Sequence, residues 1–216
     1  MLEEMGSFFD ARLEGYEQHQ LDTIEAAREF YPFTARCLPQ GAGVRILDLG
    51  CGTGLELEEY FRLCPSARVT GVDLAPGMLR ALREKFSKQA LELICGSYFD
   101  VPFGENTFDA AVSVGSLHHF TQAEKIPLYR RLRAALLPGG CFVLTDYFAR
   151  SDEEEHGLRE QLLRLRHEQR TEDGKFYHFD TPLTVRHEAE ALRAAGFSAV
   201  EVLDSWGQTS ALRAVK

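Results

Sequence analysis

The sequence is poor in basic residues relative to acidic ones. It has 24 lysines and arginines against 33 aspartates and glutamates, which gives a formal net charge of −9. Affinity for nucleic acid depends largely on neutralising phosphates, so a chain with this charge balance repels polyphosphate. We therefore expect no nucleic acid among its partners.

Long hydrophobic runs are also missing. No apolar stretch approaches the roughly 18 residues that a membrane-spanning helix needs. The first ten residues carry Glu3, Glu4 and Asp10 and no basic segment ahead of an apolar one, unlike a secretory signal. These absences predict a cytoplasmic protein that does not engage a membrane.

Cysteine spacings typical of disulfide frameworks or zinc sites are absent. The chain has no Cys-x-x-Cys, and no pair of histidines or acids at ligand spacing lies beside a second such pair. The five cysteines are odd in number and widely spaced: Cys37, Cys51, Cys64, Cys95 and Cys141. We expect reduced thiols and no metal site.

The remaining pattern alternates strands with helices. A helix is predicted over 7–38 until Pro32 interrupts it, followed by a strand at 44–49, a glycine turn and a helix through Leu63. The same pattern continues with a strand at 68–72, a helix from Pro76, strands at 91–95 and 108–114, a helix at 124–136, and an apolar run at 141–144. This alternation favours an α/β fold with a parallel sheet covered on both faces.

The last third of the chain departs from that alternation. Helices are predicted at 152–170 and at 184–195, the second ending at Gly196. Strands at 199–204 and 209–215 are joined by a short turn around Trp206 and Gly207, so they are expected to pair antiparallel. With 216 residues, 44% of them hydrophobic, and no flexible linker, the chain is expected to form one domain.

The glycine-rich turn after the first strand indicates a ligand site. Gly50, Gly52 and Gly54 would bring backbone amides and a helix N-terminus close to a ligand. A dinucleotide fingerprint has its third glycine one position later, where this chain has Leu55. Asp73, at the end of the next strand, is placed to accept ribose hydroxyls. The simpler alternative is a tight turn, with Asp73 capping the helix that starts near Pro76.

At these residues the sequence resembles the class I S-adenosylmethionine-dependent methyltransferases. The resemblance runs through VRILDLGCGTGLELEEY, VTGVDLAPGMLRALREK, FDAAVSVGSLHHF and LRAALLPGGCFVLTDY, over residues 44–147. It implies a Rossmann-like, seven-stranded, mostly parallel sheet in the order 3-2-1-4-5-7-6 with the last strand antiparallel. It also implies an N-terminal helical cap over 1–40, a cofactor core over 44–147, a second cap over 150–184, and a closing helix and hairpin over 185–216.

The resemblance further implies a set of residues around the cofactor, S-adenosyl-L-methionine. Asp48 and the three glycines would surround the methionine moiety, Asp73 would hold the ribose, and Leu74 and Met78 would pack on adenine. Ser97 stands where the family often has the aspartate that binds the adenine amino group, so Ser97 or the Tyr98 backbone would make that contact. The implied cofactor set is Asp48, Gly50, Gly52, Gly54, Asp73, Leu74, Met78, Ser97, Tyr98 and Val114.

Two residues are candidates for catalysis. His118 follows the fourth strand at the sheet edge where ligands bind, and an imidazole there suits a base or an orienting group. Tyr16 lies on the N-terminal helical segment, which closes over the active site in related enzymes. Both have simpler alternatives: His118 as a hydrogen-bonding loop residue, and Tyr16 as ordinary helix packing.

The expected function is methyl transfer to the nitrogen, oxygen or carbon of a small-molecule acceptor, by a monomer or a homodimer of an EC 2.1.1.- enzyme. A nicotinamide-dependent dehydrogenase is disfavoured by the glycine spacing. Two alternatives keep the cofactor: another chemistry, namely carboxymethyl-donor synthesis or aminopropyl transfer, or a non-catalytic cofactor-binding module.

Overall fold

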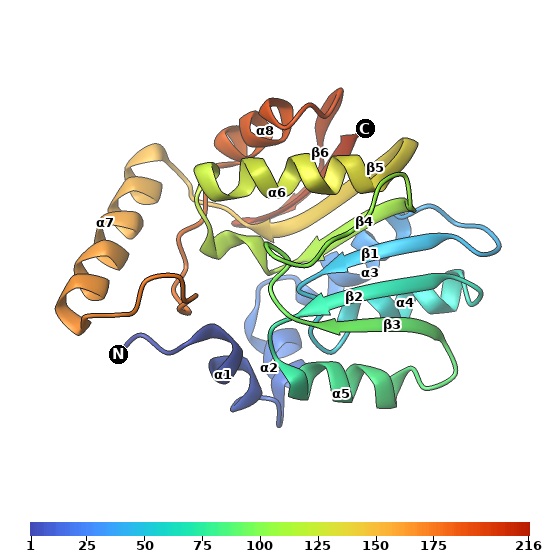
Figure 1. Cartoon of the computed structure of the whole chain (residues 1–216), viewed down its shortest axis with the longest axis horizontal. Coiled ribbons are helices and arrows are strands. Elements are labelled where there is room, and N and C mark those ends of the chain that lie inside the picture. Colours follow the sequence, from blue (N-terminus) through green and yellow to red (C-terminus); the bar gives the residue numbers. More distant parts are fainter.

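The computed structural model describes residues 1–216 and contains one seven-stranded sheet (Figure 1). The strand order is β3-β2-β1-β4-β5-β7-β6, and β7 pairs antiparallel with both β5 and β6 while the other pairings are parallel. The strands are β1 (Arg45–Leu49), β2 (Arg68–Asp73), β3 (Ala90–Cys95), β4 (Phe108–Val114), β5 (Leu136–Tyr147), β6 (Ala199–Trp206) and β7 (Thr209–Val215). Fold class, strand order and the terminal hairpin are confirmed.

Both faces of the sheet are covered by helices because its central strands are apolar on both sides. In β1, Ile46 packs into one hydrophobic cluster and Leu47 into the other, as the alternation of side chains along a strand requires. Helices α4 (Leu55–Leu63) and α5 (Pro76–Lys85) contribute to the first cluster. Helices α6 (Gln122–Ala135) and α8 (Val185–Ala194) contribute to the second.

The prediction of a single N-terminal helix over 7–38 is wrong. The segment forms three helices, α1 (Met5–Asp10), α2 (Tyr16–Thr23) and α3 (Ala27–Cys37). Gly15 and Ala26 separate them with left-handed backbone angles (φ of 76° and 58°). Apolar periodicity does not reveal such breaks, least of all at an alanine. Pro32 does not end the helix but lies inside α3.

The boundaries of β5 and α6 also differ from the sequence expectation. Strand β5 starts at Leu136 rather than Cys141, and Leu136 pairs with Phe108 of β4, so α6 ends one residue earlier than predicted. Helix α6 begins at Gln122 rather than Glu124 because Thr121 and Glu124 form a capping box.

The segment after β5 consists of a projecting helix and an irregular stretch that leads back toward the N-terminus. Helix α7 (Asp152–Gln169) has no buried residue and stands away from the sheet (Figure 1). Residues 171–184 then return toward the N-terminus, where the amide of Met5 donates to the carbonyl of Phe176 (2.9 Å). No helix in the structure is both long enough and apolar enough to cross a membrane.

A buried polar cluster joins α6 to α8. The Lys125 ammonium lies 2.5 Å from a Glu188 carboxylate oxygen, and both side chains are 1% exposed. The Tyr129 hydroxyl donates to the other Glu188 oxygen. Each buried polar group therefore depends on its partners, because an unpaired charge in this position would be strongly unfavourable.

We predict that Glu188→Leu lowers the free energy of unfolding by about 3–5 kcal/mol, because it leaves the Lys125 charge buried without a partner. The double variant Lys125→Met with Glu188→Leu is expected to lose much less. Glu190→Leu is the control: its carboxylate pairs with Arg186 on the exposed face of the same helix, so the loss should stay within about 0.5 kcal/mol. Urea unfolding measures all three, and equal losses in the single and double Glu188 variants would contradict the argument.

Candidate functional site

The glycine turn after β1 packs closely against the loop that follows β4. Gly50 has a φ of 71°, and a Cβ atom there would fall 2.0 Å from the Ser116 hydroxyl oxygen. Gly52 also has a positive φ (48°), but nothing lies within 4 Å of the position its Cβ would take. Gly50 is therefore required by close packing, and Gly52 leaves open space beside the backbone amides.

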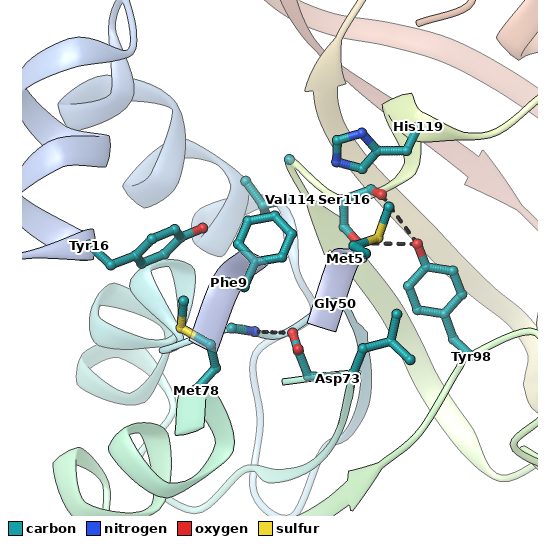
Figure 2. A pocket seen from close by; sticks show the side chains of 13 residues that line it. Met5, Phe9, Tyr16, Gly50, Asp73, Met78, Tyr98, Val114, Ser116 and His119 are labelled. Atoms are coloured by element: carbon teal, nitrogen blue, oxygen red, sulfur yellow. Dashed lines mark hydrogen bonds between the residues drawn. The ribbon is translucent and has the colours of Figure 1, made fainter. Parts of the chain in front are cut away.

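That open space belongs to a cavity of about 520 Å³ at the carboxyl ends of β1, β2 and β4. Figure 2 shows Tyr16, Phe9 and Met5 of the N-terminal helices facing Asp73 and Met78 across it. Its lining residues are Met5, Phe9, Tyr16, Gly50, Gly52, Asp73, Leu74, Met78, Tyr98, Val114, Gly115, Ser116 and His119. The cavity has the mixed polar and apolar lining of a small-molecule site.

The Asp73 carboxylate joins the glycine turn to the start of α5 at one side of this cavity. One carboxylate oxygen accepts from the Gly52 amide (2.9 Å) and the other from the Ala75 amide (2.8 Å). The N-cap residue of α5 is Ala75, so the alternative of Asp73 as the helix cap is incorrect. Burial raises the pKa of Asp73 while these amides oppose the shift. Each oxygen keeps a further lone pair that can accept a hydroxyl donor.

Two more carboxyl groups are buried beneath the glycine turn. Asp48 is 1% exposed and Glu56 is 4% exposed, and neither oxygen of Asp48 nor one oxygen of Glu56 has a hydrogen-bond partner outside this pair. Burial, with the adjacent Glu56, raises the pKa of Asp48 well above its usual range. Such a pair is compensated best by a positively charged group close by.

Most of the residues predicted from the sequence meet in this cavity. Gly50, Gly52 and Asp73 line it, as do Tyr16, Leu74, Met78, Tyr98 and Val114. Gly54, Ser97 and Asp48 do not line it. Gly54 is the N-cap of α4, and the Ser97 hydroxyl accepts from the Phe99 amide (3.1 Å). Met5, Phe9, Gly115, Ser116 and His119 were not predicted; Phe9, on the aromatic N-terminal segment, and His119, next to His118, are the two whose sequence context pointed to the site.

A second cavity, of about 880 Å³, adjoins the first. The two share Phe9, Tyr16, Gly115 and His119 in their linings. The second is otherwise lined by Gln20, Ile24, Phe30, Tyr31, His118, Thr145, Asp146, Tyr147, His178, Asp180 and Thr209. It combines five phenylalanine and tyrosine rings with a group of three histidines and two aspartates.

His118 lies in that charged group, between two carboxylates. Its Nδ1 is 2.6 Å from Asp146 Oδ1, and its Nε2 is 3.3 Å from Asp180 Oδ1. Burial disfavours the imidazolium, but the two carboxylates outweigh burial and raise the pKa of His118 to about 10. The sequence pointed to His118 but to neither carboxylate, because Asp180 is 62 positions away and Asp146 lies near the end of the next strand.

Asp146 is itself fixed by the backbone. Its Oδ2 accepts from the Leu117 amide (2.8 Å) and its Oδ1 from its neighbour, the Tyr147 amide (2.8 Å). The residue is 3% exposed. Burial acts to raise the pKa of Asp146, but the His118 charge and these donors lower it. A buried carboxylate thus fixes the Nδ1 edge of the His118 ring.

The neighbouring imidazoles are less basic. Burial and the His118 charge lower the pKa of His119, whose Nδ1 lies 3.1 Å from the Phe179 carbonyl oxygen. Burial and His119 lower the pKa of His178 to about 4, and its ring stacks on Phe8 with 3.6 Å between ring centres.

Tyr16 faces both cavities. Burial, with the charges of Asp73 and Glu56, raises the pKa of its hydroxyl well above the ordinary value. The hydroxyl therefore stays protonated at neutral pH, where it can donate a hydrogen bond. Tyr16 lines both cavities and also packs edge-on against Phe9, with 6.3 Å between the ring centres.

Comparison with known sequences identifies relatives over the middle of the chain. Residues 46–140 match a family described as a methyltransferase domain. The chain is 27% identical to a sterol 4-C-methyltransferase of Caenorhabditis elegans over 135 aligned residues. The alignment covers 59% of this chain and 38% of that protein. The chain is 33% identical over 108 residues to the demethylmenaquinone methyltransferase of Symbiobacterium thermophilum, covering 47% and 41%. The chain thus spans about two fifths of the length of these relatives.

Comparison of structures gives the same fold. An S-adenosylmethionine-dependent methyltransferase from Mesorhizobium loti superposes with a TM-score of 0.65 at 22% identity, over 91% of this chain and all of the other. The strand order, the glycine turn and the match over residues 46–140 agree with one another. Residues 46–140 therefore match the methyltransferase domain family, and the chain as a whole shares the fold of the Mesorhizobium loti methyltransferase.

Proposed function

We propose that this protein transfers a methyl group from S-adenosyl-L-methionine to a small-molecule acceptor. The observation that carries the proposal is the junction of the two cavities. The glycine-lined cavity and the aromatic cavity share Tyr16, Gly115 and His119, so a group held in the first directly faces a molecule held in the second. Catalysis of group transfer needs this proximity and alignment.

The first cavity fits the cofactor by chemistry as well as by shape. The unpaired buried oxygens of Asp48 and Glu56 suit a nearby cation, and the cofactor carries one on its amino group and one on sulfur. Asp73 has lone pairs left for ribose hydroxyls, and Leu74 and Met78 offer apolar surface to the adenine. Ser97 and the Tyr98 backbone stay proposed adenine contacts, and Gly54 and Val114 proposed members of the cofactor set.

When bound, S-adenosylmethionine supplies an electrophilic methyl group on a sulfonium centre. Phe9 and Tyr16 line the same cavity as Gly50, and their rings would limit the access of water to the sulfonium, which favours a reaction in which the charge on sulfur is lost. Both ring nitrogens of His118 already face carboxylates, so we propose that His118 orients the acceptor through its Nε2 side. Tyr16 shapes the junction and can donate a hydrogen bond from its hydroxyl.

The aromatic cavity favours a small, partly apolar acceptor. The curated relatives include methyltransferases that act on a sterol and on demethylmenaquinone, both largely apolar. The net charge of −9 disfavours nucleic acid. We propose that residues 1–216 work as one methyltransferase domain, with residues 1–40 and 150–184 as caps around a core over 44–147.

Mass spectrometry of the products is the first test of this function. The protein is incubated with methyl-labelled S-adenosylmethionine and a pool of small metabolites. We expect a labelled, methylated small molecule together with S-adenosylhomocysteine. Transfer of a carboxymethyl or aminopropyl group, methylation of only RNA or protein, or binding without turnover would each overturn the proposal.

A second prediction concerns cofactor binding. Asp73→Ala removes a charge-assisted acceptor worth roughly 1.5–3 kcal/mol, so we expect the affinity for S-adenosylmethionine to fall about 10- to 100-fold. Calorimetric titration measures it, with one site expected per wild-type chain. Asp100→Asn, which changes an exposed carboxylate outside both cavities, is the control. Wild-type affinity in Asp73→Ala would remove Asp73 from the site.

A third prediction concerns turnover. His118→Ala is expected to lower kcat about 10²-fold or more while leaving cofactor affinity nearly intact, since His118 lines only the acceptor cavity. Tyr16→Phe should have a smaller effect, because the ring remains and only the hydroxyl is lost. Steady-state kinetics with the identified acceptor checks both. A His118→Ala enzyme that turns over at the wild-type rate would show that alignment and exclusion of water suffice.

A further inference from the structure

We propose that His118, His119 and Asp180 bind a divalent transition-metal ion at the end of the acceptor cavity. Each side chain offers one ligand atom, and these atoms all lie within 4.8 Å of one another. His118 Nε2 and His119 Nδ1 are each 3.3 Å from the same oxygen of Asp180. Ligands about 2.1 Å from a tetrahedral zinc ion lie about 3.4 Å apart, so these spacings suit one shared ion.

The surroundings of His118 match those of a metal-binding histidine. Such a histidine usually gives its second ring nitrogen to a carboxylate, which fixes the tautomer and the ring orientation. Asp146 occupies that place, 2.6 Å from Nδ1, and is in turn held by the amides of Leu117 and Tyr147. The Nε2 side of the ring is thereby directed at Asp180 and the cavity. A ligating imidazole nitrogen carries no proton, so an ion would displace to solvent any proton on His118 Nε2 and on His119 Nδ1, which also lies 3.1 Å from the Phe179 carbonyl oxygen.

The two segments that carry the ligands are fastened together by the backbone. The Thr181 amide donates to the His118 carbonyl (3.0 Å), and the Thr181 hydroxyl donates to the His119 carbonyl (3.0 Å). Thr181 is 3% exposed. The position of Asp180 beside the two histidines is therefore fixed by its neighbour, and does not depend on the charge pairing alone.

The donor set narrows the kind of ion. Two imidazoles and one carboxylate favour zinc, iron(II) and similar ions over magnesium and calcium, which prefer oxygen ligands. Three protein ligands leave at least one coordination position open. The half-exposed side chain of Asp180 gives an ion a route in from solvent.

The open position would face the acceptor. An ion there would coordinate a hydroxyl oxygen of the acceptor and lower its pKa, so that the proton is lost to solvent as the oxygen takes the methyl group and S-adenosylhomocysteine leaves; an acceptor with a hydroxyl group is therefore the fitting substrate class. This role rests on the proposed methyl transfer, whereas binding of the ion does not. The proposal departs from the expectation of no metal site, which considered only spacing along the sequence.

The experiment measures metal binding without turnover. Protein stripped with a chelator is dialysed against Zn²⁺, and bound metal is counted by mass spectrometry; Co²⁺ is added separately for its visible d–d absorption. We expect one ion per wild-type chain and a Co²⁺ spectrum typical of mixed nitrogen and oxygen ligands. Asp146→Asn should weaken the affinity about 10- to 100-fold, the usual effect of losing a residue that holds a ligand, and Asp180→Asn should weaken it more.

His156→Gln and Asp173→Asn are the controls, since both side chains are exposed and lie outside the cavity. They should bind metal as the wild type does. Asp180→Asn is nearly isosteric and half exposed, and its folding is checked by circular dichroism. Less than one ion per wild-type chain, or equal binding by wild type and Asp180→Asn, would overturn the proposal. Calorimetry with S-adenosylmethionine on the same samples reports separately on the proposed function.

Discussion

The buried carboxylate of Asp146 is the interaction on which the acceptor side of the molecule depends. A charge at 3% exposure must be matched by donors, and it is matched by two backbone amides and the His118 ring. These bonds fix the loop after β4 against the end of β5. Thr181 then docks on the carbonyls of His118 and His119, which places Asp180 and the rest of the 171–184 segment.

The cofactor side depends in the same way on contacts between distant segments. Asp10 of α1 accepts from the Gly77 amide at the start of α5 (2.7 Å), which holds the N-terminal helices over the end of β2. The Met5 amide and the Phe176 carbonyl join those helices to the segment that carries Asp180. The N-terminal helices that line the cofactor cavity and the segment that lines the acceptor cavity are therefore hydrogen-bonded to each other. A ligand in one cavity is expected to change the affinity of the other cavity for its ligand.

The fold was largely determined by local sequence signals. The alternation of branched apolar strands with amphipathic helices is a short-range pattern. It predicted the succession of strands and helices along the chain and the terminal hairpin, whereas the order of the strands in the sheet came from the family resemblance. The errors fall where the pattern carries no information. Ala26 takes a left-handed conformation that its side chain does not signal, and the added length of β5 comes from pairing with β4.

The glycine turn, Asp73 and His118 can be predicted from the sequence, because each lies at the end of a strand or in the loop that follows it. The residues that surround them are brought there by the folded chain. Asp146 and Asp180 are 28 and 62 positions from His118, and the strand pairing and the returning segment bring them within hydrogen-bonding distance. A ligand set assembled from separate elements has no characteristic spacing along the chain, so only the folded backbone can reveal it.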